Sequence, residues 1–196
     1  MKKIFILSLL LLLLNSCVGS STSGVFGTGV SVALDPRTLG TQIDDSIMQK
    51  NLLARLALTE KKYFITLSVK VLDGRIFLSG KVDEPEEKLI VTKMAWETKG
   101  ARSVKNNIAV KQKFSFKNTA IDILITSQLR AALIINDNVK SANFNIDTIN
   151  QKTYIFGIAH SEDEKREIIR EAKLIVDLKE LITSILMTSD LSRQRE

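Results

Sequence analysis

The sequence predicts an α+β fold in which two copies of one small domain follow each other along the chain. Gly80 and Gly157 each close a strand pattern, and the offset that takes one to the other also aligns Leu56 with Leu133 without a gap. Both copies show the same order of patterns, namely helix, strand, strand, helix, strand. We therefore expect each copy to form a three-stranded sheet packed on two helices.

The first helix of the first copy is predicted from apolar residues at helical spacing. These residues are Ile47, Leu52, Leu53 and Leu56. Asp44 or Asp45 is expected to cap this helix, because a short side-chain acceptor can satisfy the free N–H groups of a first turn.

Two strands joined by a tight turn follow this helix. Apolar and polar residues alternate from Ile65 to Val71, which predicts a strand with one buried face. The pair Asp73 and Gly74 favours a two-residue hairpin loop that leads into a second strand at Ile76–Leu78. Gly80 and its counterpart Gly157 are expected where the second strand of each copy ends and turns, because glycine adds no side chain there.

The second helix of the first copy is predicted to begin at Pro85, which suits a first helical turn, and to stop near Gly100. A third strand follows over Val104–Val110. In the second copy, the first helix covers Ile121–Ile135, and the strands are expected at 143–148, 153–158 and 180–187. Acidic residues predict the solvated start of its second helix; they are Glu162, Asp163, Glu164 and Glu167.

The N-terminal segment resembles a secretory signal peptide. Lys2 and Lys3 precede the apolar run Ile4–Leu14, which is too short to cross a bilayer. The following Leu-Asn-Ser-Cys sequence resembles the bacterial lipobox, at which Cys17 is acylated, with palmitate for example, and the chain is cut before it. An ordinary signal peptide with an incidental cysteine is the alternative. The interpretation gives a lipoprotein signal peptide at 1–16 and a flexible, lipid-anchored tether rich in Gly, Ser and Thr at 17–40.

The charge of the chain is unevenly distributed. The formal net charge is +6, but residues 44–113 carry 14 basic and 9 acidic residues, whereas residues 118–196 carry 10 and 12. A basic surface can attract nucleic acid or anionic lipid. An exported, anchored chain meets lipid rather than DNA, so we predict no nucleic-acid partner; a solvated surface of mixed charge is the simpler interpretation.

Enzyme chemistry is not supported. His160 is the only histidine, so a histidine metal cluster is excluded, and we expect it in a surface loop. With Cys17 acylated, no cysteine nucleophile remains, and the sequence contains no phosphate-binding loop of the Gly-x-x-x-x-Gly-Lys type. We predict neither catalytic residues nor a metal nor a cofactor.

The helix Ile121–Ile135 is more apolar than one packing face requires. A surface helix carries an apolar stripe a little over 100° wide, but here apolar residues cover most of the circumference. The excess can pack on the other copy, on another protein or on a membrane. Arg130 on this helix suits a phosphate group, although a lone arginine is commonly solvated or ion-paired.

The repeated pattern, with Gly80 and Gly157 followed by a polar turn and a helix, resembles the BON domain of exported bacterial proteins. Two BON domains, at 41–113 and 118–190, behind a lipobox, a tether and the sequence Thr41–Asp45 resemble the dual-BON-domain outer-membrane lipoproteins of the DolP (YraP) type. This resemblance implies a protein anchored in the outer membrane and facing the periplasm.

The resemblance also implies a role in outer-membrane integrity and binding of anionic phospholipid through the first helix of the second domain. Carried over residue by residue, the implied contacts are Leu124, where familiar members have tryptophan, Leu129, Arg130 and Ile134. The alternative function is a membrane-tethered adaptor whose apolar helix docks an envelope protein. The sequence makes no prediction of oligomeric state.

Overall fold

The computed structural model describes residues 34–111 and 116–192. The predicted signal peptide, Cys17 and the tether up to residue 33 lie outside the described residues. The rest of the predicted flexible tether, residues 34–40, is ordered instead, because Arg37 is buried and α3 already begins at Leu39. The first repeat contains α3 (Leu39–Thr59), α4 (Tyr63–Thr66), β1 (Leu67–Leu72), β2 (Arg75–Val82), α5 (Pro85–Trp96) and β3 (Ser103–Val110). The second repeat contains α6 (Phe116–Ile135), the 3₁₀ turn η2 (Ser141–Asn143), β4 (Phe144–Ile149), β5 (Lys152–Ala159), α7 (Glu162–Lys173), β6 (Glu180–Met187) and η3 (Thr188–Asp190).

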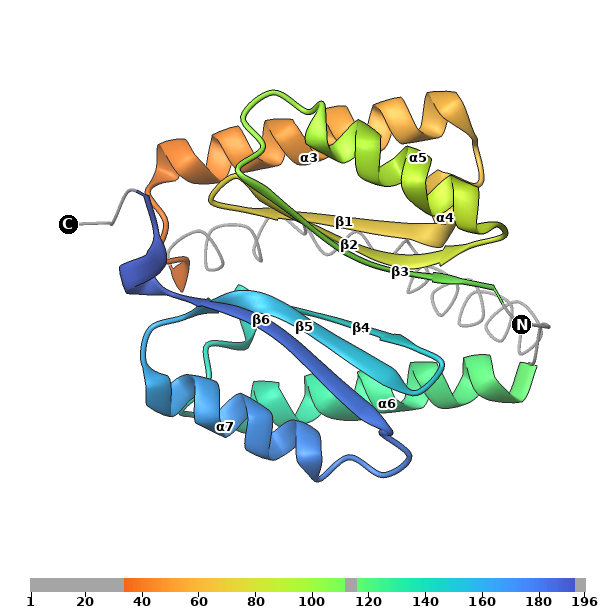
Figure 1. Ribbon diagram of the computed structural model, residues 1–196. Helices are drawn as coiled ribbons and strands as arrows, with labels where there is room; N and C mark the ends of the chain where they lie inside the picture. Colours follow the sequence, from red (N-terminus) through yellow and green to blue (C-terminus); the bar gives the residue numbers. More distant parts are fainter. Residues whose placement is uncertain (1–33, 112–115, 193–196) are drawn as a thin grey trace, which may run out of the picture. The chain divides into compact units, whose positions relative to one another are not determined.

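The two repeats have the same topology. The offset that takes Gly80 to Gly157 also takes the first residue of each long helix and strand of the first repeat to the first residue of its counterpart. In each sheet the middle strand pairs antiparallel with the strand before it and parallel with the strand after it, in the orders β1-β2-β3 and β4-β5-β6. In Figure 1, α3 and α5 cover one face of the first sheet, and α6 and α7 cover one face of the second. The predicted α+β fold is confirmed.

Each repeat buries its own core between its helices and its sheet. In the first repeat, Leu52 and Leu56 of α3 pack with Ile76 and Leu78 of β2. In the second, the equivalent positions Leu129 and Leu133 pack with Ile146 and Ile155. Met48 also belongs to the first core, whereas Ile47, predicted to be part of it, is 53% exposed.

The opposite faces of the two sheets pack on each other. Phe77 of β2 stacks on Phe156 of β5, with ring centroids 5.1 Å apart. The apolar cluster around this pair draws residues from both sheets and from the C-terminal segment. Its buried members are Leu72, Phe77, Ile149, Tyr154, Phe156, Ile158 and Leu191. The repeats are therefore joined through their sheets, and their helices remain on the outside.

A buried carboxylate ties the first helix of each repeat to the hairpin turn. Asp45 of α3 accepts the backbone N–H groups of Asp73 and Gly74, at 2.6 and 2.8 Å. Asp122 of α6, the repeat counterpart of Asp45, accepts those of Asn150 and Gln151, at 2.9 and 2.7 Å. The expectation that Asp44 or Asp45 caps the helix is wrong. The helix begins earlier, and the Thr38 hydroxyl accepts the N–H of Thr41 instead.

The predicted first strand begins too early. Ile65 lies in the one-turn helix α4 and is 85% exposed, and β1 starts at Leu67. The alternation of apolar residues continues through this turn, so periodicity alone does not locate its end. Glu164, expected on a solvated helix start, is buried, because its carboxylate accepts the backbone N–H groups of Lys140 and His160.

The two repeat glycines lie within strands, not at a turn as predicted. Gly80 pairs with Leu67 and Gly157 with Phe144, where one strand begins beside the other. A Cβ atom on Gly80 would lie 2.2 Å from the carbonyl oxygen of Thr66, and its φ is +120°. Glycine is required there by close backbone approach.

We expect Gly80→Ala to lower the free energy of unfolding by at least about 2 kcal/mol, because the added methyl group meets backbone and the φ angle disfavours any side chain. Urea unfolding followed by circular dichroism measures this change. The matched control is Gly40→Ala in α3, where a Cβ meets nothing within 4 Å. That control should leave stability unchanged or raise it by up to about 1 kcal/mol. Equal effects of the two substitutions would contradict the packing described here.

Candidate functional site

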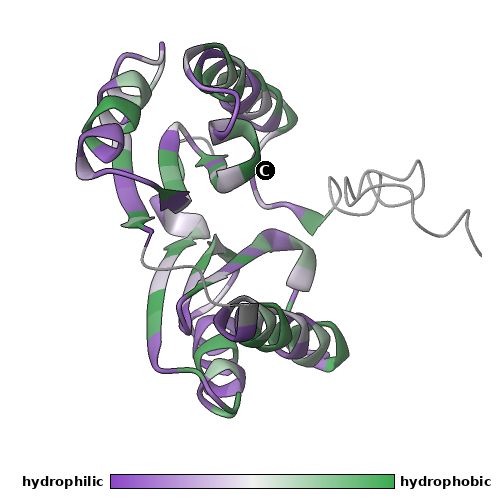
Figure 2. Cartoon of the chain, turned by 90° about the vertical axis from the view of Figure 1, so that its right-hand side faces the viewer, coloured by the Kyte–Doolittle hydropathy of each residue, from purple (hydrophilic) through white to green (hydrophobic). Residues whose placement is uncertain are grey.

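Helix α6 has two apolar faces. Leu129 and Leu133 belong to the second core, and Ile125 is buried as well. Large apolar side chains on its other face are mostly exposed: Ile123 62%, Leu124 51%, Ile134 70% and Ile135 78%. Figure 2 shows hydrophobic residues in green along most of the turns of this helix. The apolar excess predicted from the sequence is thus displayed on the surface.

The structure places three of the four predicted helix contacts on this surface. Leu124, Arg130 and Ile134 are exposed, but Leu129 is fully buried among the residues of the second core. Leu129 is therefore a packing residue, because reaching a ligand would require α6 to leave its sheet. The cluster that joins the two sheets contains no residue of α6, so packing between the repeats does not account for the exposed face.

Arg130 lies beside the edge strand of the second sheet. Its Nη2 donates to the carbonyl oxygen of Ile146 at 3.1 Å, on β4. The guanidinium lines a cleft of about 470 Å³ that also receives Lys81 from β2 of the first repeat. The Nζ of Lys81 is 3.7 Å from Asp122. No sequence pattern singles out Lys81, because its approach depends on how the sheets pack.

The segment Lys117–Ile135 is long and apolar enough to cross a membrane, judged by length and composition. In the fold it forms one wall of the second core, and its Asp122 holds the β4–β5 turn. An interfacial position, with one face in contact with lipid, keeps these contacts, whereas a spanning position would break them.

The equivalent face of the first repeat lines a larger groove. Ile47, Ala54 and Leu58 of α3 correspond, by the repeat offset, to Leu124, Ala131 and Ile135 of α6. In the first repeat these three residues line a hollow of about 940 Å³ between α3 and the loop before β3. Arg102 and Lys99 from that loop line it too. The same positions therefore line a groove in the first repeat and contribute to an exposed apolar surface in the second.

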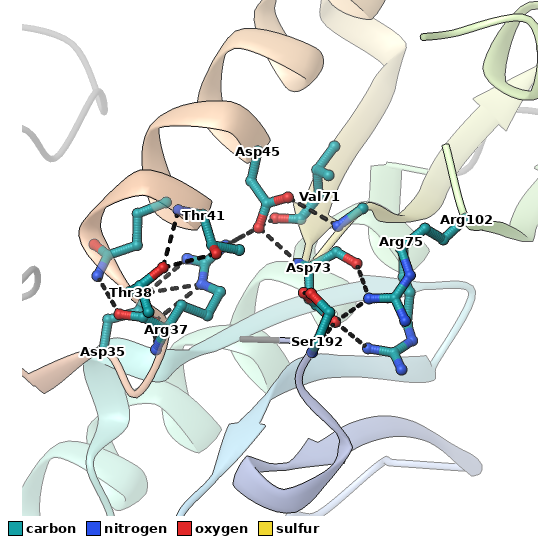
Figure 3. Close-up of polar contacts among 12 residues, drawn as sticks. Asp35, Arg37, Thr38, Thr41, Asp45, Val71, Asp73, Arg75, Arg102 and Ser192 are labelled. Atoms are coloured by element: carbon teal, nitrogen blue, oxygen red, sulfur yellow. Dashed lines mark hydrogen bonds and ion pairs between the residues drawn. The ribbon is translucent and has the colours of Figure 1, made fainter. Parts of the chain in front are cut away.

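A polar cluster fixes the entry of the chain into the first repeat (Figure 3). Arg37 is buried and forms ion pairs with Asp35, at 2.6 Å, and with Asp45, at 2.5 Å. Its Nη1 also donates to the carbonyl oxygen of Val71. Burial alone would lower the pKa of Arg37. The hydrogen bonds and charges of Asp35 and Asp45 outweigh burial and raise that pKa above its ordinary value. Because Asp45 also holds the hairpin, the entering segment and the β1–β2 turn are held by one carboxylate.

The hairpin residue Asp73 binds the C-terminal segment of the second repeat. Its carboxylate accepts the hydroxyl and the backbone N–H of Ser192 and pairs with Arg75 and Arg102 (Figure 3). Burial alone would raise the pKa of Asp73. The hydrogen bonds from Ser192 and the charge of Arg102 outweigh burial and hold that pKa below its ordinary value of 3.8.

The chain reaches the first repeat close to β4. The side-chain amide of Asn143, which directly precedes β4, donates to the carbonyl oxygen of Leu34 at 3.0 Å. Ile146, which binds Arg130, is three residues further along this strand, or about 10 Å. Leu34, the first described residue, therefore lies near the β4 edge.

Within residues 34–111 and 116–192, no group of three His, Cys, Asp or Glu side chains could hold a metal ion. His160 lies at the surface, as predicted, with its Nδ1 3.3 Å from Glu164. The carboxylate of Glu164 already accepts two backbone N–H groups and therefore has a structural role.

Comparison with protein families identifies both repeats. The BON domain family model matches residues 44–112 and 122–185. The chain belongs to the BON-domain family. The resemblance inferred from Gly80, Gly157 and the repeated pattern is confirmed.

Several relatives align with most of this BON-domain chain. An uncharacterized protein in the gshII 5' region of Anaplasma centrale is 33% identical over 123 residues, which are 62% of this chain and 82% of the relative. The outer membrane lipoprotein DolP of Haemophilus influenzae is 29% identical over 161 residues, 80% of this chain and 81% of that protein. A 21 kDa hemolysin of Actinobacillus pleuropneumoniae is 24% identical over 125 residues, 63% of this chain and 64% of the hemolysin. The chain is thus similar, over four fifths of its length, to an envelope lipoprotein.

The contact between Asp73 and Ser192 predicts a pH dependence of stability. Because the folded state lowers the pKa of Asp73, its contribution is complete above pH 3.8 and is lost as pH falls through the lower, folded pKa. We expect Asp73→Asn to lower the free energy of unfolding at pH 7 and to flatten its fall between pH 4 and pH 2. Urea unfolding across this range measures both effects, with Asp137→Asn at an exposed site as the control. Parallel pH profiles for wild type and Asp73→Asn would contradict it.

Proposed function

We propose that this chain is a lipid-anchored protein of the periplasmic side of the outer membrane. It binds anionic phospholipid through the exposed face of α6 and so supports the integrity of that membrane. One observation carries the proposal: the four exposed apolar side chains of α6 flank a cation, Arg130, on a helix whose other face is already packed. The similarity to an outer membrane lipoprotein supports the location.

The charge of α6 suits this role although its repeat is net acidic. Asp122 is the only acidic residue of the helix, and it is buried against the β4–β5 turn. Other acidic residues of the repeat lie on α7, where Asp163 and Glu167 pair with arginines of the same helix. The surface that would face lipid thus presents Lys117 and Arg130 without an exposed carboxylate of its own helix.

Apolar insertion supplies most of the binding free energy. Full burial of one leucine or isoleucine side chain contributes about 1.5–3 kcal/mol, so four half-exposed side chains contribute several kcal/mol. Leu124 adds apolar area but lacks the preference of tryptophan for the bilayer interface. An acyl chain on Cys17 would raise the local concentration of α6 at the membrane, so weak binding by this face suffices.

The second candidate is an adaptor that binds an envelope protein. The groove of the first repeat favours it, because Ile47 and Leu58 lie there beside the cations Lys99 and Arg102. An extended acidic segment with apolar side chains would match such a groove. The two candidates use different faces, and the following substitutions therefore separate them.

We expect Leu124→Asp and Arg130→Glu each to abolish co-sedimentation of the mature chain, made soluble by Cys17→Ser, with vesicles of phosphatidylglycerol and phosphatidylcholine. Both residues are exposed, so thermal unfolding should change little. Ile47→Asp is the matched control, since it occupies the same repeat position and is 53% exposed against 51% for Leu124.

Binding that is lost with Ile47→Asp and retained with Leu124→Asp would transfer the lipid role to the first repeat. No binding of the soluble chain at low salt would overturn the lipid proposal and leave the adaptor.

The anchor is tested in cells. We expect Cys17→Ser in the full chain to prevent acylation and to move the protein from the membrane fraction to the soluble periplasmic fraction, because no other cysteine is present. Mass spectrometry of the mature N-terminus and cell fractionation measure this. An unchanged mass and membrane fraction would show that Cys17 carries no lipid.

A further inference from the structure

We infer that the lipid site extends across both repeats: the cleft beside α6 binds the phosphodiester of an anionic lipid, and Phe64 and Ile65 of the first repeat enter the same membrane surface. The inference rests on the proposed function. It adds a second membrane-contacting segment, α4, and a second cation, Lys81, to the face of α6.

Helix α4 exposes two large apolar residues next to each other. Phe64 is 64% exposed and Ile65 is 85% exposed, whereas Tyr63, which anchors this turn in the first core, is 2% exposed. Ile65 lines the 470 Å³ cleft together with Ile123 of α6. Apolar side chains of both repeats therefore stand at the rim of one cleft. Ile65 thereby extends the exposed apolar face of α6 across the cleft, and a contiguous exposed apolar surface of this kind marks a contact surface.

The polar groups inside the cleft leave its cations available to an anion. Asp122 is occupied by the backbone N–H groups of Asn150 and Gln151, and Asp147 accepts the hydroxyl of Ser79. Lys81 approaches Asp122 only to 3.7 Å, beyond hydrogen-bond distance. The side chain of Lys81 is 30% exposed.

Arg130 also retains donors for a ligand. It uses Nη2 for the carbonyl oxygen of Ile146, and a guanidinium carries five N–H groups in a planar fork. Such a fork matches two oxygens of one phosphate. Lys81 supplies a second positive charge to the same cleft, from the other repeat.

The chain outside the described residues favours a membrane as the occupant. Asn143 holds Leu34 beside the start of β4, the strand to which Arg130 also binds. Cys17 precedes Leu34 by a short segment rich in Gly, Ser and Thr. The tether predicted from this composition would span about 20–25 Å, the root-mean-square distance given by 5–6 Å times the square root of its residue number. An acyl anchor on Cys17 would therefore keep the β4 edge and the cleft within reach of the bilayer surface.

The experiment places an environment-sensitive NBD fluorophore at single cysteines of the mature chain carrying Cys17→Ser, which has no other cysteine. The labelled variants are Ile65→Cys, Leu124→Cys and, as a matched control on α5, Leu89→Cys, whose wild-type side chain is 71% exposed and lines neither the cleft nor the groove. Phosphatidylglycerol vesicles should raise the emission of the Ile65→Cys and Leu124→Cys labels at least twofold and shift it to the blue. The Leu89→Cys label should not respond.

The cation is tested separately. Lys81→Gln should weaken binding to phosphatidylglycerol vesicles about fivefold, the factor that one basic residue near an anionic surface contributes, whereas Lys105→Gln on β3 should not. Phosphatidylcholine vesicles and inorganic phosphate serve as further probes. If millimolar inorganic phosphate alone occupied the cleft as fully as phosphatidylglycerol vesicles do, the cleft would be assigned to free phosphate instead of lipid.

The outcomes separate this inference from the proposed function. A response at Leu124→Cys without one at Ile65→Cys overturns the composite site and leaves α6 as the lipid-binding face. No response at either position overturns the proposed function and this inference together. Equal responses at Leu89→Cys and Ile65→Cys would show non-specific adsorption and overturn the assignment of α4.

Discussion

The apolar layer between the two sheets determines which surfaces of the molecule are exposed. Around Phe77 and Phe156, one face of each sheet packs on the sheet of the other repeat. Two helices cover the remaining face of each sheet. Both faces of each sheet are therefore buried, and the helices form the outer surface. An apolar side chain on the outside of α6 consequently has no partner within the described repeats, and burying it requires a membrane or another molecule.

The two repeats share one backbone fold but have different surfaces. Asp45 and Asp122 hold equivalent hairpins, and the closely approached Gly80 and Gly157 occupy equivalent strand positions. Position 53 of the first repeat is leucine, whereas its counterpart is Arg130. Leu53 is partly buried against the first core, whereas Arg130 is exposed and lines the cleft, so the function of a repeat can change at a position on the edge of its core. In the proposed function, the second repeat provides the main lipid-binding face, and the first repeat supports it through the sheets and at the cleft.

Much of this fold could be predicted from the sequence, because the gapless offset constrains every element twice. The site was less predictable for specific physical reasons. The family resemblance implies a ligand contact for Leu129, and a helix that is apolar around its circumference does not reveal that this residue is buried in the core. Asp45 has the chemistry of a cap, and only the folded hairpin reveals its use. Lys81 reaches the cleft across the repeat boundary, which no local pattern encodes.

In the proposed function, the exposed face of α6, rather than that of α3, is the membrane-binding surface. Methyl NMR of the mature chain with isoleucine and leucine labels, recorded with phosphatidylglycerol bicelles that contain a spin-labelled lipid, tests it most directly. We expect strong broadening of the methyl signals of Leu124, Ile134 and Ile135, with those of Ile47 and Leu58 unchanged. Broadening confined to Ile47 and Leu58, or equal broadening of both sets, would contradict it.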